Sequence, residues 1–152
     1  MIIRPAAPAD LPEIRRMFRE YADWVAVDLS FQNFEDELSG LPGNYAPPGG
    51  CLLIAEMDGR AAGCVALRAF DGAVCEMKRL FVRDGFRGSG LGRRLALAIL
   101  DEARQIGYRR IRLDTLPQMG AAHELYRSLG FREIDPYRYN PVPGTRYLEL
   151  EI

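Results

Sequence analysis

Cysteine, histidine and tryptophan are scarce in this sequence: its 152 residues include three cysteines, one histidine and one tryptophan. The cysteines, Cys51, Cys64 and Cys75, are odd in number and lack Cys-x-x-Cys spacing, which argues against a disulfide framework and a zinc cluster. Because they stand among apolar residues, we expect three buried thiols that pack as small hydrophobic groups, in a reducing, cytoplasmic environment. The single histidine, His123, has no cysteine or carboxylate at ligand spacing, so we predict no metal site.

Long hydrophobic runs and an excess of one charge are also missing. No apolar segment approaches the length that spans a bilayer, and the N-terminal residues lack the pattern of a signal peptide. The formal net charge of −1 gives no general attraction to nucleic acids or acidic membranes, so we expect neither as a partner. The hydrophobic share of 48% and the charged share of 27% are those of an ordinary globular protein, and we expect one domain over residues 1–152.

Hydrophobic periodicity and turn residues predict alternating strands and helices. The predicted strands are 1–4, 51–57, 61–70, 73–82, 110–115, a strand from 131 onward and 145–152; the predicted helices are 11–24, a short helix capped by Ser30, 88–106 and a short helix around 122–129. The order β-α-α-β-β-β-α-β-α-β-β predicts an α/β fold, a mixed central sheet with helices on both faces. In this sheet, segment 110–115 should run parallel to 73–82 through a right-handed crossover.

A glycine-rich turn, Arg87-Gly88-Ser89-Gly90-Leu91-Gly92, joins a predicted strand to the longest predicted helix. A helix start has unpaired N–H groups and a partial positive charge, and glycines let a ligand approach the backbone, so the turn predicts an anion site. A nucleotide P-loop would need lysine where Leu91 stands, and a dinucleotide fingerprint would need glycine where Arg93 stands. Both interpretations therefore fail on spacing.

The remaining pattern, Arg-x-x-Gly-x-Gly, resembles the pyrophosphate-binding motif of the GNAT family N-acetyltransferases, which hold acetyl-coenzyme A. A second segment, Ala122-His123-Glu124-Leu125-Tyr126-Arg127-Ser128-Leu129-Gly130-Phe131, resembles the family pattern Ala-x-x-Leu-Tyr-x-x-x-Gly-Phe. The order of elements is also that of the GNAT fold, so the resemblance covers nearly the whole chain. It implies an acetyl-CoA-dependent N-acetyltransferase. Met119 departs from the pattern, since the family often has an asparagine there that contacts the coenzyme.

The resemblance also implies which residues bind acetyl-CoA. The turn would hold the pyrophosphate, and the strand before it would bind the pantetheine arm through freed backbone groups, one of which would also serve the oxyanion. The implied binding residues are Leu80, Phe81, Val82, Arg87, Gly88, Ser89, Gly90, Leu91, Gly92 and Arg93. Arg93 has the simpler alternative of a solvated helix face.

Acetyl transfer to an amine needs a neutral amine and a proton for the departing thiolate. By the resemblance, the Tyr126 hydroxyl points at the coenzyme sulfur and is the general acid. Glu76 is the candidate general base, with water as the alternative; strand alternation would place it on one face with Lys78, Leu80 and Val82. A carboxylate paired with Lys78 or Arg79 on a solvated edge explains Glu76 equally well.

The acceptor is expected to be a small-molecule or peptide amine that attacks acetyl-CoA directly in a ternary complex, because no cysteine occupies a motif position. In this family the acceptor pocket is built from the regions of Trp24, Phe31, Tyr45, Tyr137 and Tyr139, although core packing accounts for several of them. Negative charge there, from Asp28, Glu35 and Asp36, favours a cationic amine or simply a solvated loop. A non-catalytic acyl-CoA-binding or sensing domain is the alternative function, and monomer and homodimer both remain open.

Overall fold

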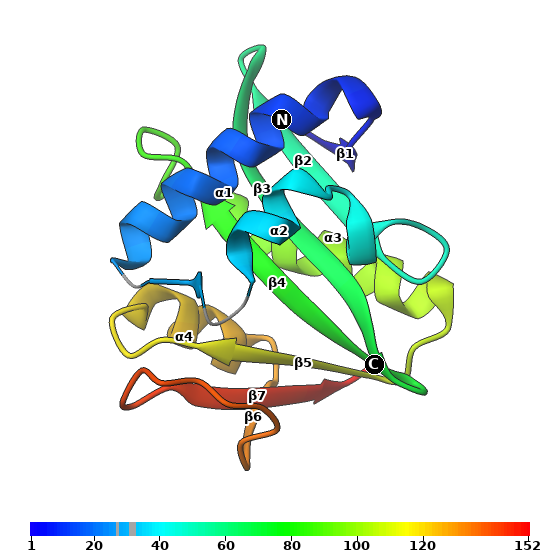
Figure 1. The fold of residues 1–152 in the computed structure, drawn as a ribbon, viewed down its shortest axis with the longest axis vertical. Coiled ribbons are helices and arrows are strands. Elements are labelled where there is room, and N and C mark those ends of the chain that lie inside the picture. The colour runs from blue at the N-terminus through cyan, green and yellow to red at the C-terminus, as the bar shows by residue number, and fades with distance from the viewer. Residues whose placement is uncertain (27, 31–32) are drawn as a thin grey trace.

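The computed structural model describes residues 1–26, 28–30 and 33–152. It contains one seven-stranded sheet in the order β1-β2-β3-β4-β5-β7-β6 (Figure 1). The strands are β1 (Ile2–Pro5), β2 (Cys51–Met57), β3 (Arg60–Asp71), β4 (Val74–Val82), β5 (Arg110–Thr115), β6 (Arg132–Ile134) and β7 (Arg146–Glu151). The helices are α1 (Leu11–Val25), α2 (Phe34–Ser39), α3 (Leu91–Ile106) and α4 (Gly120–Ser128), with short 3₁₀ turns η1 (Pro8–Asp10) and η3 (Gly43–Tyr45). The predicted element order is confirmed.

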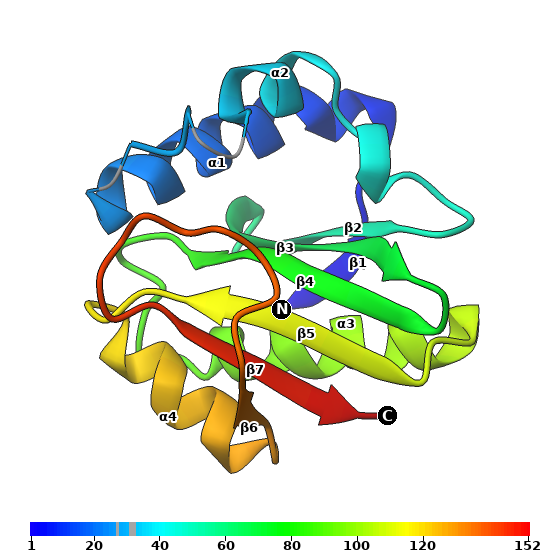
Figure 2. The ribbon, with the colours of Figure 1, turned by 60° about the horizontal axis from the view of Figure 1, so that its bottom comes forward.

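Helices cover both faces of the sheet, as predicted. Figure 2 shows α1 and α2 on one side and α3 and α4 on the other. The apolar stripe of α1, with Ile14 and Phe18 fully buried, packs with α2 and one face of the central strands. The stripe of α3, with Leu95 and Ile99 fully buried, packs with the opposite face. We call these the α1 cluster and the α3 cluster.

The strands β4 and β5 are parallel, as predicted, but they pair over only three positions. The register joins Val74 to Arg110, Cys75 to Ile111 and Glu76 to Arg112, and stops there. Beyond Glu76, β4 stays paired with β3, while β5 stays paired with β7. The two strands therefore separate toward their C-terminal ends and leave backbone groups of β4 without a strand partner on that side.

A β-bulge in β4 changes which face its side chains take. Cys64 of β3 pairs with Phe81, and Ala66 pairs with Lys78, so β4 contains one extra residue between these pairs. The extra residue is Arg79, whose φ is 60°, a left-handed conformation that is unusual for arginine.

The predicted alternation along β4 is consequently wrong. Before the bulge, the residues that alternate with Glu76 and Lys78 pack in the α3 cluster, so these two side chains face the α1 side. After the bulge, Leu80 and Val82 pack against the α3 cluster instead. The expected common face of the four residues fails because one inserted residue reverses the alternation.

The second helix begins later than predicted. Its first residue is Phe34 and its N-cap is Asn33, at a φ of 55°. Ser30 does not cap it; the backbone N–H of Ser30 instead donates to the carboxylate of Asp28 at 2.9 Å. Phe31, which we expected in the region of the acceptor pocket, lies outside the described residues.

The three cysteines are free and buried, as predicted. Burial raises the pKa of Cys51 to about 11 and that of Cys64 and Cys75 to about 12. None of the helices in the described ranges combines the length and the apolar character needed to cross a membrane. Across the same residues, no three histidine, cysteine or acidic side chains come together as metal ligands would.

Candidate active site

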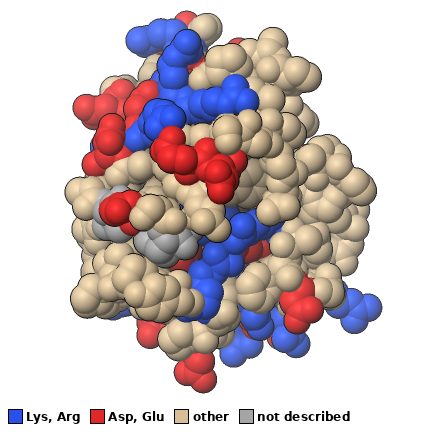
Figure 3. All heavy atoms as spheres, in the orientation of Figure 1, with Lys and Arg blue, Asp and Glu red and all other residues tan. Residues whose placement is uncertain are grey.

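A cleft opens where β4 and β5 separate. Polar side chains in its wall come from β4, from β5 and from the loop between β6 and β7, and apolar ones come from α1, α4 and neighbouring segments. The residues that line it are Tyr21, Leu29, Met77, Lys78, Arg79, Leu80, Leu113, Asp114, Thr115, Leu116, Met119, Tyr126 and Asn140. In the space-filling view, Lys and Arg side chains form a band in the hollow over β4 and β5 (Figure 3).

Tyr126 projects into this cleft from α4. The residue is 5% exposed, and its ring packs against Phe131 with centroids 5.5 Å apart. Its hydroxyl makes no hydrogen bond within residues 1–26, 28–30 and 33–152. Burial raises the pKa of this hydroxyl above its usual value near 10, so it stays protonated at neutral pH. The proton is therefore present on a group that lines the cleft.

A second hollow, which we call the coenzyme groove, runs from the cleft to the glycine turn. Residues of β4, the turn, α3 and α4 line it, together with Trp24 at the end of α1: Trp24, Leu80, Phe81, Val82, Phe86, Arg87, Gly88, Gly90, Leu91, Gly92, Met119, Ala121, Ala122 and Leu125. The cleft and the groove share Leu80 and Met119. Most of the residues predicted to bind acetyl-CoA thus border one continuous hollow that leads toward Tyr126.

The backbone of the glycine turn presents unpaired donors. The N–H groups of residues 87–93 donate no hydrogen bond to any residue that the structure describes, and the first bonded amide is that of Arg94, to the carbonyl of Gly90 at 3.2 Å. Gly88 and Gly90 have φ values of 79° and 81°, which side chains rarely adopt. These amides stand at the start of α3, where the helix dipole adds positive potential. The turn therefore has the donors and the field of a phosphate site.

The two arginines predicted to contact phosphate bond to the protein itself. The Nε of Arg87 donates to the carbonyl of Val82 at 3.0 Å, and its guanidinium lies over Trp24, 4.8 Å from the ring centroid. Arg93 reaches from α3 to α4, where it donates to the Ser128 hydroxyl at 2.9 Å. Both side chains are partly exposed, so neither contact prevents a move toward a bound phosphate.

Comparison with known proteins identifies the family. The profile described as "Acetyltransferase (GNAT) family" matches residues 11–131, which is most of the chain. The chain belongs to the GNAT acetyltransferase family. It is 42% identical over 147 residues to an uncharacterized N-acetyltransferase of Schizosaccharomyces pombe, covering 95% of this chain and 90% of that protein.

One further relative and two solved structures extend this picture. The chain is 37% identical over 99 residues to N-acetylaspartate synthetase of Homo sapiens, covering 64% of this chain and 33% of that protein. A Salmonella typhimurium protein solved with acetyl-CoA has a TM-score of 0.69 to this chain at 25% identity, and the match covers 99% of this chain and 92% of that one. A GNAT structure from Staphylococcus aureus shares the fold, with a TM-score of 0.82 over 99% and 98% of the chains at 20% identity.

These findings make the protein an acetyl-CoA-dependent N-acetyltransferase with the GNAT fold, as its motifs predicted. The relative from Schizosaccharomyces pombe is named an N-acetyltransferase and the human one a synthetase, so the alternative of a non-catalytic acyl-CoA-binding domain is not favoured.

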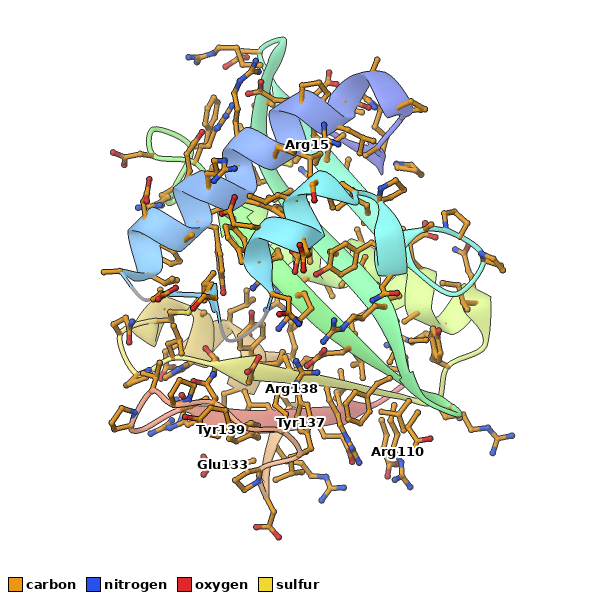
Figure 4. All side chains as sticks on the ribbon, viewed as in Figure 1. Arg15, Arg110, Glu133, Tyr137, Arg138 and Tyr139 are labelled. Atoms are coloured by element: carbon orange, nitrogen blue, oxygen red, sulfur yellow. The ribbon has the colours of Figure 1, made fainter. Side chains whose placement is uncertain are left out.

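Glu76, the candidate base of this GNAT enzyme, lies at the centre of a buried ion cluster. It is fully buried. Its Oε1 accepts hydrogen bonds from Arg68 at 2.9 Å and from Arg138 at 2.8 Å, and its Oε2 accepts one from the Tyr137 hydroxyl at 2.8 Å. Figure 4 shows Tyr137 and Arg138 together over β5 and β7. Glu76 does not line the cleft. These partners come from β3 and from the β6–β7 loop, whereas Arg79 pairs with Glu37 instead.

Lys78, Asp114, Thr115 and Asn140 are polar cleft residues that sequence reasoning did not assign to the site. Lys78 is 5% exposed, and its Nζ lies 3.8 Å from Oδ1 of Asp114. Burial lowers the pKa of Lys78 to about 8. Asn140 donates to the same aspartate at 3.2 Å. A burial signal existed only for Thr115, the last residue of β5, which shares the alternation of Ile111 and Leu113. A lysine or aspartate in a strand ordinarily indicates a solvent-facing position.

The aromatic residues expected around the acceptor do not gather at one place. Trp24 borders the coenzyme groove, and Tyr137 bonds to Glu76. Tyr45 is 2% exposed and packs edge-on to Phe18 in the α1 cluster, so it is a core residue. Tyr139 is 77% exposed and lines neither the cleft nor the coenzyme groove.

Proposed function

We propose that this enzyme transfers the acetyl group of acetyl-CoA to a primary amine by direct attack in a ternary complex, with Tyr126 as the general acid. The carrying observation is that the coenzyme groove and the cleft meet at Leu80 and Met119, and that Tyr126 also lines the cleft. A thioester held in the groove would have its sulfur near a protonated phenol. The name of the related N-acetylaspartate synthetase, which points to an amino-acid product, agrees with a primary amine as acceptor.

The amides of the glycine turn support the binding half of this proposal. Unpaired N–H groups over residues 87–93 fit a pyrophosphate, and the unpaired edge of β4 at Leu80, Phe81 and Val82 fits the amides of the pantetheine arm. A backbone N–H near Phe81 or Val82 would also stabilise the oxyanion. The carbonyl of Val82 now accepts from Arg87, so we expect Arg87 to exchange this bond for one to a phosphate.

The cysteines support direct transfer. An acyl-enzyme route would need a thiolate beside the thioester, and none of the three cysteines lines the cleft or the groove. Their raised pKa values further keep them as thiols at neutral pH.

The amine must also lose a proton, either to Glu76 or to water. Both oxygens of Glu76 already accept hydrogen bonds, two of them from guanidinium groups, and the residue stands behind the cleft wall. The carboxylate therefore does not face an amine held in the cleft, and its oxygens are turned to these three donors. We therefore favour water as the base and assign Glu76 to holding the β6–β7 loop against the sheet.

The substitution Tyr126→Phe tests the general acid. We expect turnover to fall by about 10²- to 10³-fold, the usual contribution of a positioned acid, while the Kd for CoA changes by less than about twofold. The readout is free thiol released from acetyl-CoA with an amine that the wild type acetylates, beside CoA titration by calorimetry. Tyr108→Phe is the matched control, since its hydroxyl donates to the carbonyl of Gly49, which borders neither the cleft nor the groove. Wild-type turnover in the Tyr126 variant would remove this residue from the mechanism.

A further inference from the structure

One buried hydroxyl in the wall of the cleft has no partner. Thr115 is 2% exposed, and its Oγ1 makes no hydrogen bond to any residue within 1–26, 28–30 and 33–152. The other buried side-chain atoms in this state belong to Tyr45, His123 and Arg138, and none of those residues lines the cleft or the coenzyme groove. Buried polar atoms are nearly always bonded, so an unbonded hydroxyl beside the cleft marks a place where a ligand supplies the missing contact.

This hydroxyl lies on the same side of the sheet as Tyr126. Thr115 shares the alternation of Ile111 and Leu113, which are buried in the α3 cluster. Tyr126 belongs to the same cluster and comes from α4, on the α3 side of the sheet (Figure 2). By the same alternation, Asp114 points to the opposite side. Two hydroxyls from different elements therefore reach the cleft from one side of the sheet.

The two hydroxyls border the gap that a thioester would enter. The pairing of β4 with β5 ends at Glu76 and Arg112, and beyond it Leu80 of β4 and Thr115 of β5 both line the cleft. Leu80 also lines the coenzyme groove. A pantetheine arm bound along the free edge of β4 would therefore bring its sulfur into the space that Leu80, Thr115 and Tyr126 share.

The departing sulfur needs hydrogen-bond donors at this place. When the C–S bond breaks, its electron pair goes to the sulfur, and negative charge develops on an atom that the protein encloses. Donors fixed beside the atom on which charge develops lower the barrier of such a step. Because the protein leaves the Thr115 hydroxyl unbonded, its proton is free for this contact and no other hydrogen bond has to break first.

We propose that Thr115 is a second catalytic residue of the acetyl transfer, and that its hydroxyl donates a hydrogen bond to the coenzyme sulfur beside Tyr126. The amine nitrogen bonds to the carbonyl carbon and loses a proton to water, while the C–S bond breaks and Tyr126 gives its proton to the sulfur. Tyr126 then recovers a proton from solvent. Thr115 keeps its proton throughout and stabilises the charge only through the hydrogen bond. This inference rests on the proposed acetyl transfer and adds a donor to it.

The stability of the free enzyme separates this role from a structural one. Thr115→Val nearly keeps the shape of the side chain and removes an unbonded buried hydroxyl, so its urea midpoint should equal or exceed that of the wild type. The matched control is Thr145→Val, because the Thr145 hydroxyl donates to the carbonyl of Val142 at 2.7 Å and borders neither the cleft nor the groove. Its midpoint should fall with the lost hydrogen bond. A comparable fall for Thr115→Val would mean that the hydroxyl is already bonded and would overturn the proposal.

Turnover is measured with the same variants, as free thiol released with an amine that the wild type acetylates. We expect kcat of Thr115→Val to fall by about 10- to 10²-fold, as the loss of one hydrogen bond to a charged atom predicts. Thr115→Ser, which restores a hydroxyl, should stay within a few-fold of the wild type, and Thr145→Val within about twofold. Wild-type kcat in Thr115→Val would remove this residue from the chemistry.

Coenzyme binding locates the contact and needs no turnover. CoA and dethio-CoA, in which hydrogen replaces the thiol, are titrated by calorimetry. The wild type should bind CoA more tightly than dethio-CoA, and Thr115→Val should lose most of this preference. A preference that the variant retains in full would overturn the contact with sulfur. If no amine releases thiol although CoA binds, the proposed transfer fails, and this comparison still decides whether Thr115 contacts the sulfur.

Discussion

Removal of the negative charge at Glu76 should destabilise the protein strongly. Glu76→Gln keeps the size of the side chain, and its amide oxygen can still accept hydrogen bonds. The two guanidinium groups, however, lose the carboxylate that balances their charge. Breaking a buried ion pair from one side typically destabilises by about 3–5 kcal/mol. Arg68 and Arg138 keep 24% and 21% of their side chains exposed, so water can partly solvate them. We therefore expect the lower end, about 3 kcal/mol.

This loss is large enough to measure in two ways. In a chain of this size, about 3 kcal/mol corresponds to a fall in Tm of about 6–12 °C. Urea titration should show a lower midpoint at an unchanged slope. The matched control is Glu133→Gln, a 66% exposed carboxylate 3.9 Å from Arg146, for which we expect less than about 0.5 kcal/mol.

The same variant also separates structure from catalysis. Well below its Tm, folded Glu76→Gln should retain turnover within a few-fold of the wild type if water is the base. A loss of about 10²-fold or more in the folded protein would make Glu76 the base instead. A destabilisation under 1 kcal/mol would refute the reasoning about the ion cluster, because a buried carboxylate with three donors cannot then be holding the loop.

Three further predictions concern the turn, the cleft lysine and the bulge. Gly90→Ala and Gly59→Ala both place a side chain at positive φ with open space around it, so each variant should be destabilised by about 1 kcal/mol. Only Gly90→Ala should also bind CoA more weakly in calorimetry. Equal CoA affinity of the two variants would contradict a role for the turn. Between pH 8 and 10.5 the unfolded chain holds the Lys78 proton more tightly than the native protein does, so the free energy of unfolding should rise with pH because of this group. In urea titrations, the free energy of unfolding of the wild type should therefore increase relative to that of Lys78→Met between pH 8 and 10. A constant difference would mean that the pKa is not lowered. Arg79→Met should destabilise the protein by about 3 kcal/mol, because Glu37 loses its buried partner. The double variant Arg79→Met with Glu37→Leu should recover most of this stability. A double variant no more stable than the single one would argue against the ion pair.

The local sequence determined the order of the elements and the two motifs. Periodicity placed β2 and β5 at their observed bounds, and α3 ends at Ile106, the last residue of the predicted helix. The glycine turn and the position of Tyr126 on a helix also follow from residues close together in the chain. Such signals can be read from the sequence because backbone dihedrals, caps and side-chain periodicity depend on neighbours a few positions apart.

Tertiary structure decided what surrounds the reacting groups. The bulge at Arg79 has no glycine to announce it, yet it turns Leu80 and Val82 to the face opposite Glu76 and Lys78. Contacts between distant segments created the rest: Glu76 is bonded to a loop more than sixty positions away, and Lys78 meets Asp114 only because β4 and β5 lie side by side before they part. Charges on a strand report nothing about such partners until the sheet and its loops bring them together, and for that reason the acceptor side could not be read from the sequence.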